Sequence, residues 1–203
     1  AIGHSVVTLG VSGEPNIKLK KQSFDSSGQN IFFNYDGRLY QKRLNLIGGF
    51  QAQNVLMAAA LVISLGSDPQ DVFSVLHNLL TVKGRMELAA SRANGANVFI
   101  DYAHTPDAIE TAITSLRPHV FGRIIAVIGA GGDRDQSKRP LMGLAASKTA
   151  DVVIVTDDNP RSEDPAKIRQ MIIKGIGPGI SHECGDRACL LYTSDAADDV
   201  RCG

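Results

Sequence analysis

The 203-residue chain lacks an excess of charge of either sign, because 21 lysines and arginines balance 21 aspartates and glutamates. A balanced composition gives no basic field to attract nucleic acid or an anionic membrane surface, so neither is expected as a partner. The longest apolar stretch, about residues 55–65, is too short to span a bilayer. The chain does not open with a charged segment followed by an apolar one, as a signal peptide would. These absences favour a cytoplasmic location.

Cysteine is also scarce. The three cysteines, Cys184, Cys189 and Cys202, lie near the C-terminus without metal-ligand spacing and without an even-numbered disulfide framework. The sequence therefore indicates neither a metal site nor a disulfide scaffold, which agrees with the cytoplasm as the compartment.

Two glycine-rich phosphate-binding motifs are missing as well. The chain contains no Gly-x-x-x-x-Gly-Lys-Ser/Thr loop. Gly129-x-Gly131 follows a strand pattern, but Arg134 stands at the sixth position, where a dinucleotide fingerprint needs a small residue. We expect these glycines to let the backbone turn sharply, so that residues 133–135 project into a crevice.

The second half of the chain alternates strand and helix patterns. Short apolar runs at 98–101, 123–128 and 151–156 predict strands, and the last two have the continuous apolar pattern of buried strands. Helices are expected after them, with Thr105 capping Pro106, a start at 138–140, and Asp164 capping a helix from Pro165 to about Lys174. The alternation predicts an α/β fold, a Rossmann-like and mostly parallel sheet with helices on both faces.

The first half has different signals. Asp36-Gly37 between two apolar runs predicts a hairpin turn. A helix is expected over about 52–65, closed by Gly66, and a second over about 69–79, capped by Asp68. Residues 81–84 then read as a short linker into the second domain.

The most informative stretch is Asp157-Asp158-Asn159-Pro160-Arg161, which follows the predicted strand 151–156. Pro160 has no backbone donor and restricts its neighbour to extended conformations, so the strand must end there. Ligands of open α/β sheets bind at the carboxyl ends of the strands. The guanidinium of Arg161 suits a carboxylate and Asp158 suits an ammonium group, so together they suit an amino acid. On this segment alone, a polar loop with a solvated arginine is an equal alternative.

Four motifs resemble, in order and spacing, those of the Mur ligases. They are Gly84-Arg85-Met86-Glu87, Asp101-Tyr102-Ala103-His104-Thr105-Pro106-Asp107-Ala108, Gly131-Gly132-Asp133-Arg134-Asp135 and Thr156-Asp157-Asp158-Asn159-Pro160-Arg161. Folylpolyglutamate synthases share the second motif. The Asp-Asn-Pro-Arg motif is more specific, since it is similar to that of the members that add meso-diaminopimelate rather than lysine. The resemblance covers about residues 2–188.

This resemblance implies an ATP-dependent amide ligase of peptidoglycan precursor synthesis, which adds meso-2,6-diaminopimelate to UDP-MurNAc-L-Ala-D-Glu through an acyl phosphate. ATP and Mg²⁺ are the implied cofactors, bound mainly by an upstream region, so this chain alone is expected to be inactive. The implied partners are those three small molecules, and the protein is expected to be a monomer. Two alternatives within the superfamily are a lysine-adding ligase and a folylpolyglutamate synthase-like ligase. An alternative of another class is a non-catalytic, Rossmann-like module that binds an amino acid.

The resemblance also implies roles for individual residues. Those implied to bind meso-diaminopimelate are Arg134, Asp158, Asn159, Pro160 and Arg161. Those implied to face the nucleotide, across a domain cleft, are Arg85, Asp101, Tyr102 and His104. No catalytic residue and no metal ligand is assigned to this chain. For His104 the alternative is a loop histidine satisfied by a backbone carbonyl, and His4, His77, His119 and His182 are expected to be surface or turn residues.

Three segments are expected along the chain. Residues 1–82 are predicted to be the C-terminal part of a central ATPase domain, and residues 83–188 a truncated C-terminal domain. Residues 189–203 depart from the family pattern and are interpreted as read-through of a sequencing adapter, with an acidic disordered tail as the alternative. We expect the whole protein to carry a phosphate-binding loop and a UDP-sugar-binding domain upstream, and a further Gly-Lys-Gly-His-Glu segment downstream.

Overall fold

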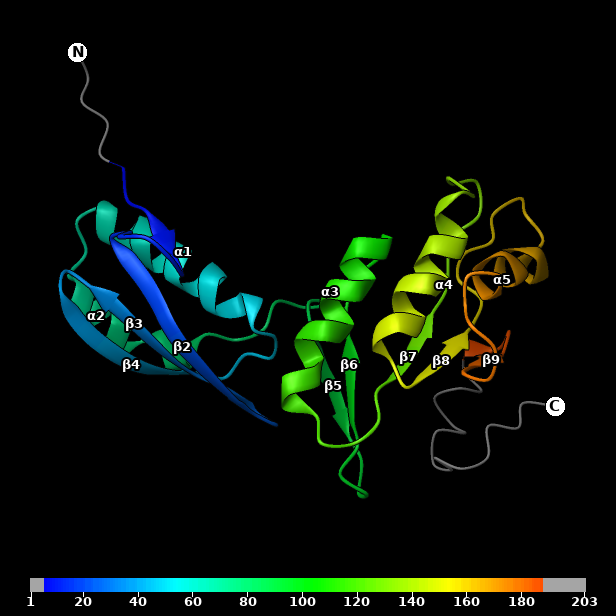
Figure 1. Ribbon diagram of the computed structural model, residues 1–203, viewed down its shortest axis with the longest axis horizontal. Coiled ribbons are helices and arrows are strands. Elements are labelled where there is room, and N and C mark those ends of the chain that lie inside the picture. Colours follow the sequence, from blue (N-terminus) through cyan, green and yellow to red (C-terminus); the bar gives the residue numbers. More distant parts are fainter. Residues whose placement is uncertain (1–5, 188–203) are drawn as a thin grey trace, which may run out of the picture. The chain divides into compact units, whose positions relative to one another are not determined.

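The computed structural model describes residues 6–187, which divide into two compact units (Figure 1). The first unit contains the residues up to Asp101 together with Pro118–Val120. The second contains Tyr102–Arg117 and the residues from Phe121 onward. The chain therefore passes between the units three times.

A four-stranded sheet forms the base of the first unit. Its strands neighbour one another in chain order: β1 (Leu9–Gly10), β2 (Ile17–Asp25), β3 (Gly28–Tyr35) and β4 (Arg38–Leu44). β1 is parallel to β2, and the other pairs are antiparallel. The predicted turn at Asp36-Gly37 is confirmed, with φ of 48° and 72° at its two residues. Positive φ at both positions is what a two-residue type I′ hairpin requires.

Two helices pack against this sheet, α1 (Phe50–Ser64) and α2 (Pro69–Ser74). Phe33 lies at the centre of the shared core, fully buried and edge-on to Phe73. Both helices were expected, but the second is shorter than predicted. It ends at Ser74 and continues as the 3₁₀ turn η1 (Leu76–Asn78). The Ser74 hydroxyl donates to the carbonyl of Asp71, and this local bond competes with regular helical bonding.

A separate hairpin follows, formed by β5 (Glu87–Ser91) and β6 (Asn97–Ile100). The strand predicted at 98–101 is thus present, but it pairs antiparallel with β5 and is not hydrogen-bonded to the parallel sheet. The reason is the turn Asn94-Gly95, where Gly95 has a φ of 85° and the Arg92 amide donates to the Ala96 carbonyl at 2.8 Å. This Asn-Gly signal was overlooked in the sequence.

His119 lies in the 3₁₀ turn η2 (Arg117–His119), so the expectation of a turn histidine is confirmed, whereas its burial excludes the surface alternative. Its Nδ1 lies 2.7 Å from the carbonyl oxygen of Asp25, and its Nε2 lies 3.0 Å from the amide nitrogen of Gly48. A carbonyl accepts and an amide donates, so the ring is neutral with its hydrogen on Nδ1. Partners so distant along the chain leave no local pattern in the sequence.

The second unit confirms the predicted parallel sheet. Its strands are β7 (Ile125–Ile128), β8 (Val152–Val155) and β9 (Ser181–Glu183), in that order and all parallel. Helix α4 (Lys138–Thr149) connects β7 to β8, and α5 (Pro165–Ile173) connects β8 to β9. Helix α3 (Pro106–Leu116) packs against α4, which also packs against α5 (Figure 1). The predicted caps Thr105 and Asp164 both accept backbone hydrogen bonds.

Burial differs between the two best-predicted strands. β8 has Val153 and Val155 fully buried on one face and Ile154 buried on the other, as a strand covered on both faces should be. β7 alternates instead, since Ile125 and Val127 are each 45% exposed. The described residues therefore cover one face of β7, and its expected burial on both faces is wrong for this part of the chain. No helix within residues 6–187 is long and apolar enough to cross a membrane.

Glycines set the distance between α4 and α5. A Cβ at Gly143 would lie 2.1 Å from the carbonyl oxygen of Ile172, and one at Gly175 would lie 1.8 Å from that of Pro140. The two backbones touch at both places, so side chains are excluded there. This close approach holds the first half of α4 against the C-terminal end of α5.

Candidate functional site

Two loops meet at the carboxyl ends of the parallel strands. The glycine loop, residues 129–137, connects β7 to α4, and the proline loop, residues 156–164, connects β8 to α5. The Gly132 amide donates to the Asn159 carbonyl at 2.9 Å. A Cβ at Gly132 would lie 1.8 Å from the carbonyl oxygen of Pro160. Glycine is required here because the backbone of one loop lies directly on that of the other.

Polar bonds connect the two loops further. The Asp133 carboxylate accepts from the hydroxyl of Ser162, and the Asp133 amide donates to Glu163 at 2.6 Å. The guanidinium of Arg161 donates to the carbonyl oxygen of Gly132. Asp133 and Arg161 have φ of 52° and 49°, a left-handed conformation that costs free energy for residues other than glycine. Such conformations persist where surrounding contacts hold them, and here each loop holds the strained residue of the other.

The strongest of these contacts is the ion pair between Glu163 and Arg139. Both carboxylate oxygens of Glu163 accept from the Arg139 guanidinium, at 2.7 and 2.8 Å. The Arg139 side chain is 2% exposed and Glu163 is 21% exposed. The bonds from Arg139, and then from the Asp133 amide, lower the pKa of Glu163 from its usual 4.5 to about 2. Glu163 is therefore ionised in the folded protein well below the pH at which an ordinary glutamate takes up its proton.

This lowered pKa makes part of the stability pH-dependent. In the unfolded chain the pKa of Glu163 returns to about 4.5. The contribution of the ionised carboxylate to the free energy of unfolding is therefore complete above that pH, and it is lost as the pH falls from about 4.5 through about 2. We expect the Glu163→Gln variant to be less stable than the parent at pH 6, with the difference shrinking towards pH 2. The difference in stability is measured by urea unfolding of both proteins between pH 6 and pH 2. A difference that stays constant with pH contradicts the assignment.

The residues expected to bind an amino acid gather at this end of the sheet. Arg134, Asp158, Asn159 and Arg161 are exposed, and Pro160 is half-buried at the turn. The bond between Asp133 and Ser162 brings together the backbones next to Arg134 and Arg161, which lie on facing loops. Asp158 has Arg187 at 3.8 Å. Two guanidinium groups, a carboxylate and an amide thus surround one edge, and such a set can bind a zwitterion.

The residues expected to face a nucleotide fall into two pairs. In the first unit Arg85 is exposed, and the carboxylate of Asp101 accepts from the Met86 amide at 2.9 Å, so these two motifs adjoin. In the second unit, Nδ1 of His104 donates to the carbonyl of Tyr102 at 2.9 Å. This bond to a backbone carbonyl is the one expected in the alternative reading of His104 as a loop histidine. It occupies Nδ1 and leaves Nε2 as the ring nitrogen that can bind a ligand. The nucleotide-facing role stays a prediction.

The residues present fit a nucleotide phosphate only in part. Arg85 and His104 carry groups that bind phosphate oxygens. Within residues 6–187, however, no three His, Cys, Asp or Glu side chains are grouped to hold a metal ion. Mg²⁺ in nucleotide sites is held by one or two carboxylates together with substrate phosphates, so what the described residues lack is a metal site made of three protein ligands.

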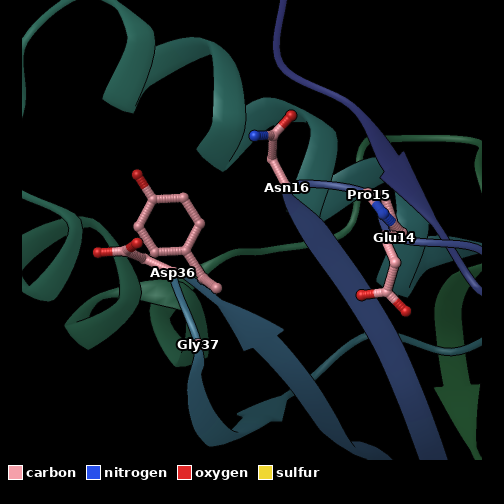
Figure 2. A pocket seen from close by; sticks show the side chains of 6 residues that line it. Glu14, Pro15, Asn16, Asp36 and Gly37 are labelled. Carbon is pink, nitrogen blue, oxygen red and sulfur yellow. The ribbon is translucent and has the colours of Figure 1, made fainter.

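A shallow hollow in the first unit is lined by none of these residues (Figure 2). Its lining comes from the β3–β4 turn and the segment before β2: Glu14, Pro15, Asn16, Tyr35, Asp36 and Gly37. No positively charged side chain is in this lining. The hollow therefore offers no counterpart for a phosphate or a carboxylate.

Three residues that organise the site were missed in the sequence: Asp133 as a loop-bridging group, Arg139 and Glu163. A signal for Arg139 does exist, since it lies on the apolar face of α4 with Met142 and Ala146, at helical spacing. An arginine on a buried helix face needs a carboxylate partner. Glu163 carried no comparable signal, because one acidic residue in a polar loop looks like any other.

The second unit is an α/β fold whose polar loops lie at the carboxyl ends of parallel strands, where open sheets of this kind bind their ligands. A family model described as "Mur ligase, glutamate ligase domain" matches residues 84–199. This match covers more than half of the chain, and the chain belongs to the Mur ligase family.

Curated relatives agree. The chain is 45% identical over 194 residues to the UDP-N-acetylmuramoyl-L-alanyl-D-glutamate–2,6-diaminopimelate ligase of Caulobacter vibrioides, and 45% identical over 192 residues to that of Zymomonas mobilis. The alignments cover 96% and 95% of this chain but 39% of each relative, so the chain spans about two-fifths of their length.

Solved structures show the same fold. A structure of a UDP-N-acetylmuramoyl-L-alanyl-D-glutamate–2,6-diaminopimelate ligase matches 97% of this chain and 40% of its own, with a TM-score of 0.67 and 30% identity. A folylpolyglutamate synthase from Mycobacterium tuberculosis matches 91% of this chain and 43% of its own, with a TM-score of 0.68. At 22% identity, the second match supports the fold alone.

Proposed function

We propose that this chain is part of an ATP-dependent ligase that adds meso-2,6-diaminopimelate to UDP-MurNAc-L-Ala-D-Glu in peptidoglycan precursor synthesis. The observation that carries the proposal is the pair of facing loops, in which the bond from Ser162 to Asp133 joins the residues next to Arg161 and Arg134, with Asp158 exposed on the same loop as Arg161. Relatives that bear this ligase name, at 45% identity, support it.

The loops suggest how the amino acid is held. A diaminopimelate has a carboxylate and an ammonium group at each end, and lysine lacks the far carboxylate. Arg161 and Arg134 hold that carboxylate, while Asp158 and Asn159 hold the adjacent ammonium, and Pro160 fixes the turn that presents them. The other amine is then oriented towards the activated glutamate. Positioning of this kind lowers the barrier by removing orientational freedom before the reaction.

ATP supplies the activation, because a carboxylate does not condense with an amine unaided and is first converted to an acyl phosphate. We assign Arg85, Asp101, Tyr102 and His104 to the surface that faces the nucleotide. Mg²⁺ and the triphosphate are bound mainly by residues outside this chain, and no residue of the chain is proposed as catalytic.

The proposal includes the domain organisation. Residues 1–82 belong to a central ATPase domain and residues 83–188 to the C-terminal domain, and the family match that begins at residue 84 supports this boundary. The interpretation of residues 189–203 as adapter read-through lies outside the described residues and stays a prediction, although the family match extends to residue 199. A cytoplasmic, monomeric enzyme completes the proposal.

The test uses the full-length enzyme with ATP, Mg²⁺ and UDP-MurNAc-L-Ala-D-Glu, and compares meso-diaminopimelate, L-lysine and L-glutamate as the amine. Product formation with diaminopimelate at a kcat/KM far above that with the others supports the proposal. Preference for lysine identifies the lysine-adding alternative. Binding of an amino acid without any phosphate release identifies a non-catalytic module.

The 203-residue chain itself is expected to release no phosphate from ATP and to form no product. The reason is that its sequence contains no phosphate-binding loop to hold the triphosphate. A coupled phosphate-release assay with all three substrates checks this. Turnover above a blank without the protein contradicts it.

A further inference from the structure

We propose that Glu163, held by Arg139, is a positioning residue for amino-acid specificity, which acts through Arg161 and does not touch the substrate. This inference rests on the proposed function. Glu163 lies two residues after Arg161, and its amide donates to the Pro160 carbonyl at 2.9 Å, which closes the turn that contains Arg161. Its carboxylate reaches the opposite loop, at the amide of Asp133. One side chain thus fixes both loops.

The strength of this bridge comes from Arg139. The arginine projects from the first turn of α4, is 2% exposed, and donates to both oxygens of Glu163. It also reaches the Gly131 carbonyl at 3.4 Å, within the glycine loop. A bidentate, desolvated pair has one favoured geometry, unlike a flexible surface pair. The orientation of α4 is thereby transmitted to both loops.

The bridge compensates for strain at the residues that meet the ligand. Asp133 precedes Arg134, and both Asp133 and Arg161 are in the left-handed conformation. If the bridge is removed, these residues can relax towards ordinary backbone angles, and such a relaxation displaces the two guanidinium groups. A displacement of about 1 Å in a positioning group can cost roughly a hundredfold in rate. The fold need not be lost, because α4 and α5 remain in contact through Gly143 and Gly175.

The experiment is a double-mutant cycle in the full-length enzyme with Glu163→Gln, Arg161→Ala and the combination of both. Glu163→Gln is expected to raise KM for meso-diaminopimelate by about tenfold or more, with KM for ATP nearly unchanged. In the Arg161→Ala background its further effect is expected to be much smaller than in the parent, since the part that acts through Arg161 is already lost and only the displacement of Arg134 remains. Glu163→Asp is expected to recover part of the loss.

The matched control is Asp151→Asn. Asp151 also pairs with an arginine, Arg117 at 2.6 Å, and accepts from a backbone amide, Ile124 at 2.7 Å, but it precedes β8 and so lies at the opposite edge of the sheet. The control is expected to leave KM for diaminopimelate unchanged. Additive effects of Glu163→Gln and Arg161→Ala, or equal rises in both KM values, overturn the inference and indicate a purely structural role. An enzyme that does not use diaminopimelate at all overturns the proposed function instead.

Discussion

Replacing Arg161 by alanine in the full-length enzyme is expected to lower kcat/KM for meso-diaminopimelate by an amount equivalent to about 3–5 kcal/mol of transition-state stabilisation. This is the scale for removing one partner of a charge pair that is desolvated in the complex, where the ligand covers the otherwise exposed Arg161. Since each 1.4 kcal/mol is tenfold, this is roughly a hundred- to several-thousandfold. The guanidinium of Arg161 offers a planar fork that matches a carboxylate, and one of its nitrogens already bonds Gly132. The alanine variant therefore loses both the ligand contact and a contact between the loops.

The loss is expected to be confined to the amine substrate. ATP-dependent activation of the glutamate precedes attack by the amine, so KM for ATP should stay near its parent value. Arg161→Lys separates charge from geometry, because an ammonium group keeps the charge but cannot form the two parallel bonds. The control is Lys167→Ala, which removes an exposed cation from α5. Steady-state kinetics with varied diaminopimelate measure all three variants.

Discrimination against lysine gives the sharpest outcome. A site built around a polar partner rejects an analogue that lacks it by about 10⁴-fold, because its own buried polar groups stay unpaired. Arg161→Ala should therefore reduce the preference for diaminopimelate over lysine. If the variant keeps a near-normal kcat/KM for diaminopimelate, Arg161 is not the specificity residue and the lysine-adding alternative gains support.

Replacing Gly132 by alanine is expected to have the second-largest effect. The new methyl group would lie 1.8 Å from the Pro160 carbonyl oxygen, a backbone atom that cannot rotate away. The two loops must separate, at a cost of about 1–3 kcal/mol for overpacking. Separation breaks the bond from Gly132 to Asn159 and displaces Arg161, so binding of diaminopimelate should fall together with thermal stability.

Gly122→Ala is the matched control for this substitution. Gly122 lies in the same unit, and a Cβ built there meets no atom within 4 Å. Calorimetric melting and KM for diaminopimelate should be close to parent values in this variant. A Gly132→Ala variant as stable and as active as the control contradicts the close loop contact on which the site depends.

The sequence predicted local features, such as helix caps, better than it predicted the pairing of every strand. Caps such as Asp164, and Pro160 in the loop that follows β8, act through their immediate neighbours, so their consequences are visible locally. The pairing of β6 with β5 was not predicted, because the residue pattern of a strand does not identify the strand with which it pairs. The Asn94-Gly95 turn, which decides this pairing, was not considered. Helix α2 was predicted too long because the change to 3₁₀ winding, which buries Leu76 beside Phe73, has no signature in apolar spacing.

Residues that act at a distance were the hardest to foresee. Arg134 and Arg161 could be proposed because each ends up on a loop after a parallel strand, where ligands bind. Glu163 and Arg139 act through contacts 24 residues apart, and His119 through contacts 71 and 94 residues apart. Such pairs depend on tertiary packing, and one sequence does not reveal them.

The path of the chain at His119 limits how the protein can be dissected. Pro118–Val120 belong to the first unit, whereas the residues on either side belong to the second. A truncation after Asp101 would remove the imidazole that accepts from Gly48 and donates to Asp25, and would leave both backbone groups unpaired inside the shortened piece. A cloning boundary between the units therefore cannot be a single cut, and an autonomous first unit would need residues 118–120 grafted back through a designed linker.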